Sequence, residues 1–164
     1  MRKLFLVFII GILGLALAAD PAEGYWLSVD EKSGEITAGW EIYQRDGLLY
    51  GQILSAAGSP HGKLAEKCKE SYADFPVVGK VNKMTVVNTP WIYGLKRNRP
   101  GEWSGGRIID PGSGNMYNCK IIHRPANGSR YKVDTLEMRG EIGLGLGRSQ
   151  FWQKSNRVRA AGLK

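Results

Sequence analysis

The stretch EIGLGLGRSQFWQ, residues 141–153, decides the fold of this chain. Its glycines occupy every second position and are followed by an arginine and an aromatic pair. A phosphate-binding loop places its glycines between a strand and a helix, because the helix N-terminus supplies the aligned backbone amides. Here the residues after the glycines are strand-like and no amphipathic helix follows. The stretch therefore predicts the closing strand of a β-barrel and argues against a nucleotide-binding loop.

Alternation along this strand assigns its side chains to two faces. The residues expected to share one face are Ile142, Leu144, Leu146, Arg148 and Trp152. The glycines fall on the other face. Glycine in a strand permits strong bending or a close backbone approach, which barrel closure requires.

The rest of the chain repeats short segments rich in aromatic and β-branched residues, separated by turn signals. The strands expected before residues 141–153 are 25–30, 36–44, 48–55, 83–88, 91–95, 102–110, 116–124 and 131–140. The polar segment 56–75 is the one place where a short helix is expected, for instance over Lys63–Glu70. The sequence therefore predicts an all-β fold, a single antiparallel up-and-down barrel or strongly curled sheet of about eight strands. A sandwich or a mixed α/β fold is the alternative.

The N-terminal segment has the pattern of a secretory signal. Arg2 and Lys3 precede an apolar run over Leu4–Leu17, and small residues then predict cleavage after Ala18 or Ala19. An uncleaved anchor is the alternative, but the run is shorter than the roughly 20 residues that a membrane-spanning helix needs. We therefore expect a periplasmic or secreted protein with a cleaved signal at 1–18, a barrel domain at 19–153 and a basic C-terminal tail at 154–164.

The net charge of +8 is concentrated at the two ends of the chain. The basic residues of the last segment are Lys154, Arg157, Arg159 and Lys164, with no acid among them. Such a tail is usually solvated, although it could contact an anionic envelope surface. Because the body of the chain carries little net charge, we do not expect nucleic acid as a partner. A monomer is expected.

Cys68 and Cys119 are the only cysteines. In an exported protein, an even pair favours a disulfide over a metal site or two free thiols. The sequence therefore predicts a Cys68–Cys119 bridge.

An arginine on an apolar strand face needs a partner. The first strand offers one in Gly24-Tyr25-Trp26, because a guanidinium over an indole gains roughly 0.5–2 kcal/mol. A Gly-x-Trp on the first strand with a late arginine resembles the lipocalin-like barrels, in which these residues close the base. The resemblance implies that Gly24, Trp26, Arg148 and Trp152 close the barrel. The alternative is an ordinary core tryptophan and a surface arginine.

A second resemblance covers nearly the whole chain after the signal. The matching segments are GYW at 24–26, IYQRDGLLYGQI at 42–53, PVVG at 76–79, GL at 94–95, EWSGGRIIDPGSGNMY at 102–117, LEMRGEIG at 136–143 and GRSQFW at 147–152. Together they resemble a bacterial exported family known as domain of unknown function 2147. This resemblance implies a small, exported, β-rich protein with no established activity. Some relatives carry a CxxC pair in the middle loop, but Ala65 stands at the earlier position here, so a redox pair is not expected.

Catalytic and metal-binding patterns are weak. His61 and His123 are the only histidines, and no cluster of acids accompanies either, so neither a metal nor a cofactor is expected. His123 shares strand parity with Tyr117 and Cys119, which favours an inward-facing, hydrogen-bonded residue. Neither Ser104 nor Ser113 has the Gly-x-Ser-x-Gly setting of a hydrolase nucleophile. We therefore do not expect an enzyme.

Two functions fit such a barrel. A barrel of about eight strands can hold one small ligand or fill its interior with side chains. The first hypothesis is binding of a small apolar or anionic amphiphilic ligand, such as a fatty acid, in the cell envelope. The alternative is a ligand-free structural or protein-interaction module of the envelope.

Overall fold

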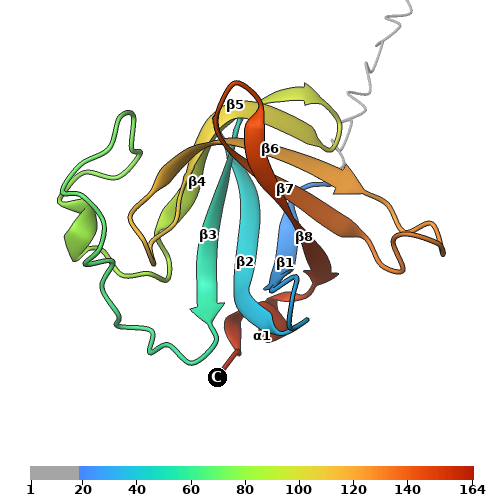
Figure 1. Ribbon diagram of the computed structural model, residues 1–164, viewed down its shortest axis with the longest axis horizontal. Helices are drawn as coiled ribbons and strands as arrows, with labels where there is room; N and C mark the ends of the chain where they lie inside the picture. Colours follow the sequence, from blue (N-terminus) through green and yellow to red (C-terminus); the bar gives the residue numbers. More distant parts are fainter. Residues whose placement is uncertain (1–18) are drawn as a thin grey trace, which may run out of the picture.

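Within residues 19–164, which a computed structural model describes, eight antiparallel strands close into one barrel (Figure 1). The strands are β1 (Gly24–Val29), β2 (Ile36–Arg45), β3 (Leu48–Ala56), β4 (Pro90–Arg99), β5 (Glu102–Ile109), β6 (Met116–Arg124), β7 (Thr135–Gly143) and β8 (Leu146–Ser155). Each strand pairs with its neighbours in chain order. The predicted all-β barrel is confirmed. The predicted signal at 1–18 lies outside the described residues.

The barrel closes where β1 pairs with β8. The closing register joins Tyr25 to Ser155, Trp26 to Lys154 and Leu27 to Gln153. The stretch 141–153 therefore does supply the strand that closes the barrel, β8. One end of the barrel, here called the base, carries the turns at 46–47 and 100–101, the loop 125–134 and residues 20–23. The other end, the mouth, carries the segments 30–35, 57–89, 110–115 and 144–145.

The stretch 141–153 is nevertheless not one continuous strand. The chain reverses at Leu144-Gly145, and the φ angles of Gly143, Leu144 and Gly145 are all positive. Because this turn interrupts the alternation, Leu144 leaves the predicted shared face and is fully exposed. Ile142, Leu146, Arg148 and Trp152 do share one face, which lines the cavity at the mouth, with Trp152 buried and Ile142 and Leu146 largely exposed. Gly143 and Gly145 serve this left-handed turn. Gly147 instead permits a close approach to β7, as predicted, because an added Cβ there would lie 2.4 Å from Gly140 O.

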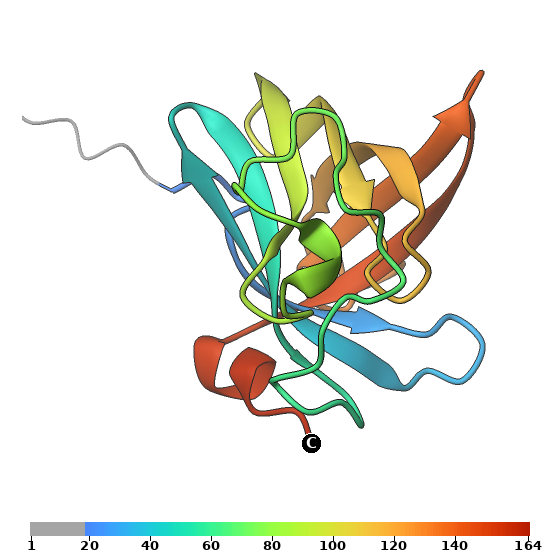
Figure 2. The same ribbon diagram turned by 90° about the vertical axis from the view of Figure 1, so that its left-hand side faces the viewer.

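The β3–β4 loop, residues 57–89, also differs from prediction. No helix forms over Lys63–Glu70, and the strand expected at 83–88 is replaced by a 3₁₀ turn, η1 (Val81–Lys83), and an isolated bridge. The two limbs of the loop bond to each other, with Ala65 N donating to Met84 O at 2.9 Å and Val86 N to Lys63 O at 2.8 Å. These long-range bonds replace local helical ones. Figure 2 shows the loop in front of the barrel.

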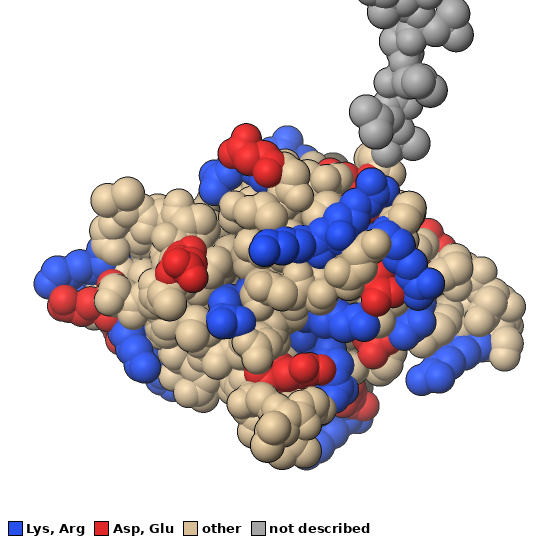
Figure 3. Space-filling view, turned by 90° about the horizontal axis from the view of Figure 1, so that it is seen from above, with Lys and Arg blue, Asp and Glu red and all other residues tan. Residues whose placement is uncertain are grey.

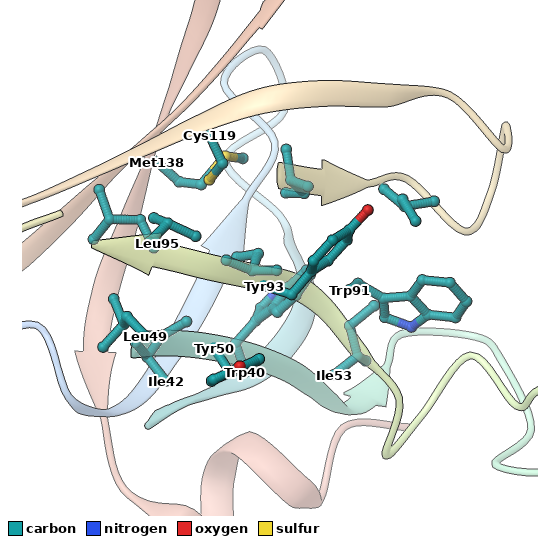
Figure 4. Close-up of a cluster of buried hydrophobic side chains, with 14 of the residues drawn as sticks. Trp40, Ile42, Leu49, Tyr50, Ile53, Trp91, Tyr93, Leu95, Cys119 and Met138 are labelled. Carbon is teal, nitrogen blue, oxygen red and sulfur yellow. The ribbon is translucent and has the colours of Figure 1, made fainter. Parts of the chain in front are cut away.

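The core lies inside the barrel and under this loop. Figure 4 shows Trp40, Ile42, Leu49 and Ile53 of β2 and β3 packing with side chains of β4. The β4–β5 pair is especially close at Gly106, where an added Cβ would lie 2.4 Å from the carbonyl oxygen of Tyr93. Only glycine permits that approach.

The one α-helix within residues 19–164 is α1 (Arg157–Ala161), in the segment predicted as a solvated tail. Ala160 is fully buried, and its carbonyl accepts a 2.7 Å hydrogen bond from Ser55 Oγ. Gly39 makes room for this contact, because a Cβ there would lie 1.8 Å from Ala160 O. The end of the chain is therefore packed on the outside of β2 and β3, with Arg157 and Arg159 exposed. Along residues 19–164 we find no helix with the length and apolar character to cross a membrane.

The predicted disulfide is absent, and both cysteines are buried free thiols. Cys119 lies beside Met138 inside the barrel (Figure 4). Cys68 lies in the β3–β4 loop against Gly114, where an added Cβ would lie 3.1 Å from the Cys68 Cα. Gly114 precedes Cys119 by five residues, or roughly 16 Å of strand. A disulfide needs Cα atoms within about 7 Å. Burial also raises the pKa of the Cys119 thiol.

Candidate functional site

The base of the barrel is sealed by the carboxylate of Asp20, whose side chain is 1% exposed. It accepts hydrogen bonds from Trp103 Nε1 at 3.1 Å, Ala22 N at 3.0 Å and Gly101 N at 3.1 Å. Arg97 Nε lies 3.1 Å from it. The short N-terminal segment before β1 is thereby fixed across the base, and Trp26 Nε1 donates to Ala22 O at 3.0 Å.

These contacts predict how the stability of the protein changes as the pH falls. Burial alone would raise the pKa of Asp20, but the hydrogen bonds from Ala22, Trp103 and Gly101 and the charge of Arg97 lower it below 3.8. The carboxylate therefore stabilises the fold fully above about pH 4, and this contribution is lost as pH falls through the lower folded-state pKa. We expect the free energy of unfolding, measured in urea, to fall more steeply below about pH 4 in the wild type than in Asp20→Asn. Equal slopes would mean that other carboxylates dominate.

The cation over Trp26 is Lys154, and the predicted Arg148 contact is wrong. Lys154 Nζ lies 4.3 Å from the indole centroid and donates to Glu23 O at 2.8 Å. Gly24 makes room for it, because a Cβ there would lie 2.8 Å from Lys154 Nζ. Gly24 and Trp26 therefore meet at the base, as expected, around a different cation. Partial burial lowers the pKa of Lys154.

Arg148 lies near the mouth, six residues before Lys154 on β8 and so roughly 20 Å away from the base. Its side chain is 68% exposed, and Nη2 lies 3.0 Å from Glu31 Oε2. The alternative of a surface arginine is therefore correct. Trp152, the fourth predicted closing residue, lies between the two ends and stacks on Trp40, with ring centroids 4.6 Å apart.

His123 is an interior residue of the base, as its parity on β6 predicts. Its ring meets Trp26 edge-on at 6.2 Å, and Nε2 lies 3.3 Å from Asp134 Oδ2. Between residues 19 and 164, the structure contains no group of three or more His, Cys, Asp or Glu side chains placed to hold a metal ion.

A cavity of about 830 Å³ opens at the mouth. Its wall is mainly apolar and includes Trp40, Ile53, Ile108, Met138 and Trp152. Ligand sites of small molecules have volumes of roughly 300–1,000 Å³ and the same apolar character. The cavity is therefore large enough for one small ligand.

The two indole N–H groups of the cavity wall are hydrogen-bonded within the protein. Trp40 Nε1 donates to Ser28 Oγ at 3.3 Å, and Trp152 Nε1 donates to Gln150 Oε1 at 3.1 Å. The stacked indoles therefore offer an apolar surface to a ligand. Because these donors are satisfied within the chain, a hydrocarbon in the cavity leaves none of them unpaired.

Charged side chains gather at the rim. Lys63 of the β3–β4 loop and Arg148 of β8 line the cavity, together with Asp110. Asp110 is engaged by its own turn, since it accepts from Gly112 N at 2.8 Å and Ser113 Oγ at 2.7 Å. Among the described residues, Lys63 forms no ion pair. Lys63 is therefore a rim cation outside any ion pair of the described residues, and it can meet an anionic group of a ligand.

Elsewhere on the surface, charges are mixed. Figure 3 shows lysine and arginine side chains running across one face with acidic side chains among them. Ion pairs join neighbouring strands, as between Lys120 and Glu102 at 3.1 Å and between Arg124 and Glu137 at 2.7 Å. On the face shown, positive charge is not collected into one uninterrupted stripe.

Comparisons with known proteins agree with this architecture. The chain is similar to a solved structure of a protein from the human pathogen Helicobacter pylori, described as belonging to the lipocalin family. The match has a TM-score of 0.64 and 14% sequence identity, and it covers 87% of this chain and 90% of the other. At that identity the likeness shows the fold alone. Among curated proteins, no significant match was found.

The family assignment comes from a family model, described as an uncharacterized protein conserved in bacteria (DUF2147), which matches residues 24–154. The match begins at the first residue of β1 and ends within β8, so it takes in every strand of the described barrel. The chain therefore belongs to the DUF2147 family, and its barrel is lipocalin-like.

Proposed function

We propose that this protein is an exported binding protein that holds one small apolar or anionic amphiphilic ligand, such as a fatty acid, in the mouth cavity. The observation that carries the proposal is the apolar cavity of about 830 Å³ with Lys63 and Arg148 at its rim. The basic and apolar pattern of residues 2–18 supports export to the periplasm or the exterior.

The apolar wall favours a hydrocarbon chain. Each methylene removed from water contributes about 0.8 kcal/mol, and this contribution offsets the entropy lost on binding. The wall residues belong to strands on several sides of the barrel, including Trp40 on β2, Ile108 on β5 and Trp152 on β8. A chain in the cavity would therefore be surrounded.

The rim favours an acidic head group over an uncharged one. Lys63 and Arg148 approach the opening from different elements, and a carboxylate between them could accept from both. Arg148 holds Glu31 through Nη2, which leaves its other nitrogens free for a ligand. A ligand with a neutral head would lose this contribution.

The proposal is tested by titration with palmitate and with hexadecanol, which share the chain and differ in the head group. Trp40 and Trp152 lie in the wall, so intrinsic fluorescence should report binding. The blocking variant is Gly140→Leu. A Cβ at Gly140 meets nothing closer than 3.5 Å, so the backbone accepts a side chain, which would project into the cavity that Gly140 lines. We expect palmitate to bind more tightly than hexadecanol, and Gly140→Leu to weaken both roughly tenfold or more.

The matched control is Gly62→Leu, which adds the same side chain in open space on the β3–β4 loop. It should bind palmitate like the wild type. Equal affinities for Gly140→Leu and wild type, or no saturable binding of either probe, would contradict the proposal and favour a ligand-free interaction module.

A further inference from the structure

The tip of the β7–β8 hairpin, residues 142–146, exposes three large apolar side chains. Ile142 is 74% exposed, Leu146 is 64% exposed and Leu144 is fully exposed. Scattered single apolar residues are normal on a protein surface, but three together on one turn are typical of an interaction site.

The backbone makes the leucine at the turn still less expected. Leu144 has φ of +50°, in the left-handed region, which glycine and asparagine adopt more easily than a branched apolar residue. Neither the conformation nor the packing of the barrel therefore calls for leucine at this position. Both arguments indicate that the Leu144 side chain contacts something other than this protein.

The tip is accessible. Figure 2 shows the β7–β8 hairpin projecting away from the rest of the barrel. An added Cβ at Gly143 or Gly145 would meet no atom within 4 Å. The apolar side chains of the tip can therefore contact a surface outside the protein.

The geometry points to insertion of this tip into the surface of a phospholipid bilayer. A stable protein partner usually covers about 800 Å² on each side, which three side chains on the tip 142–146 cannot supply. Interfacial insertion needs only a few apolar side chains in front of a polar belt.

Charged groups behind the tip fit the head-group layer. Arg139 bonds Glu141 through Nε at 2.7 Å and the carbonyl of Gly145 through Nη2 at 2.8 Å, which stiffens the hairpin. Arg148 is exposed beside Glu31 and keeps further N–H groups for lipid phosphate. These groups would stay in the head-group region when the tip enters the apolar layer.

The tip adjoins the mouth cavity, since Ile142 and Leu146 also line it. An amphiphile leaving the bilayer could then enter the cavity without crossing water. This last step rests on the proposed function, whereas insertion of the tip does not.

The test is sedimentation with vesicles of phosphatidylethanolamine and phosphatidylglycerol. Leu144→Asn removes the apolar side chain and suits the left-handed backbone better, so the variant should melt at the wild-type temperature or higher. We expect its vesicle affinity to fall roughly tenfold or more. The matched control is Val78→Asn, at a fully exposed apolar residue of the β3–β4 loop, which should bind vesicles like the wild type.

Equal vesicle binding by Leu144→Asn and wild type, or an equal loss in Val78→Asn, would overturn the inference. So would a wild-type dimer that Leu144→Asn converts to a monomer, because the tip would then dock on a second copy. Gly140→Leu should lose palmitate and keep vesicle binding, so failure of this inference can be distinguished from failure of the proposed function.

Discussion

Replacing Asp20 with alanine should lower the free energy of unfolding by roughly 3–5 kcal/mol. The substitution leaves three buried donors, Trp103 Nε1, Ala22 N and Gly101 N, without their acceptor. It also removes the partner of Arg97. Each buried donor left unsatisfied costs about 1–3 kcal/mol. Urea unfolding followed by circular dichroism measures the loss.

The matched control is Asp30→Ala. Asp30 also accepts from two backbone amides, Lys32 N at 3.0 Å and Ser33 N at 2.8 Å, but in an exposed turn. Water can replace it there, so we expect a much smaller loss of stability than in Asp20→Ala. If the two variants lose the same stability, Asp20 does not seal the base.

Trp26→Ala should cost roughly 3–5 kcal/mol, because the fully buried indole leaves a cavity at the base. The loss should couple to Lys154, whose ammonium group lies 4.3 Å from the ring. In a double-mutant cycle, Trp26→Ala with Lys154→Met should fall short of additivity by about 0.5–1 kcal/mol. Methionine keeps most of the apolar stem of the lysine and removes the charge, together with the hydrogen bond to Glu23 O.

Arg148→Ala is the comparison in the same strand. Its exposed pair with Glu31 should contribute at most about 1 kcal/mol, and its effect should add to that of Trp26→Ala. Coupling of Trp26 to Arg148, together with additivity for Lys154, would reverse the assignment of the cation at the base.

The cation over Trp26 is Lys154 and not the predicted Arg148, and this difference shows what can be predicted from the sequence. A glycine and a tryptophan on the first strand do predict a closed base with a cation over the indole. The identity of that cation depends on the β1–β8 register, which pairs Trp26 with Lys154. No local pattern specifies that register, because it follows from the shear of the closed barrel.

The same limit explains the hairpin. Alternating Gly and Leu fits both a bent strand and a left-handed turn, and only the pairing of Glu141 with Gly147 decides between them. Side-chain period alone therefore predicts Leu144 on the apolar face of a strand, whereas the turn places it in solvent.

Long-range partners were hidden for a similar reason. Asp20 lies outside every predicted strand, yet it bonds to Gly101 and Trp103, more than eighty residues away. The cysteine pair follows a compartment rule, but the rule says nothing of whether Cys119 faces into the barrel. The cavity depends on which inward positions are small, as at Gly140 and Ala38, and this becomes visible only when the strands are in register.

That the mouth cavity holds an amphiphile is tested most directly by native mass spectrometry of the protein purified from its own cells without detergent. We expect part of the wild-type protein to carry one molecule that is released on denaturation. Gly140→Leu prepared in parallel should carry none. The bare chain mass for both proteins, with no saturable uptake of palmitate by the wild type, would contradict the claim.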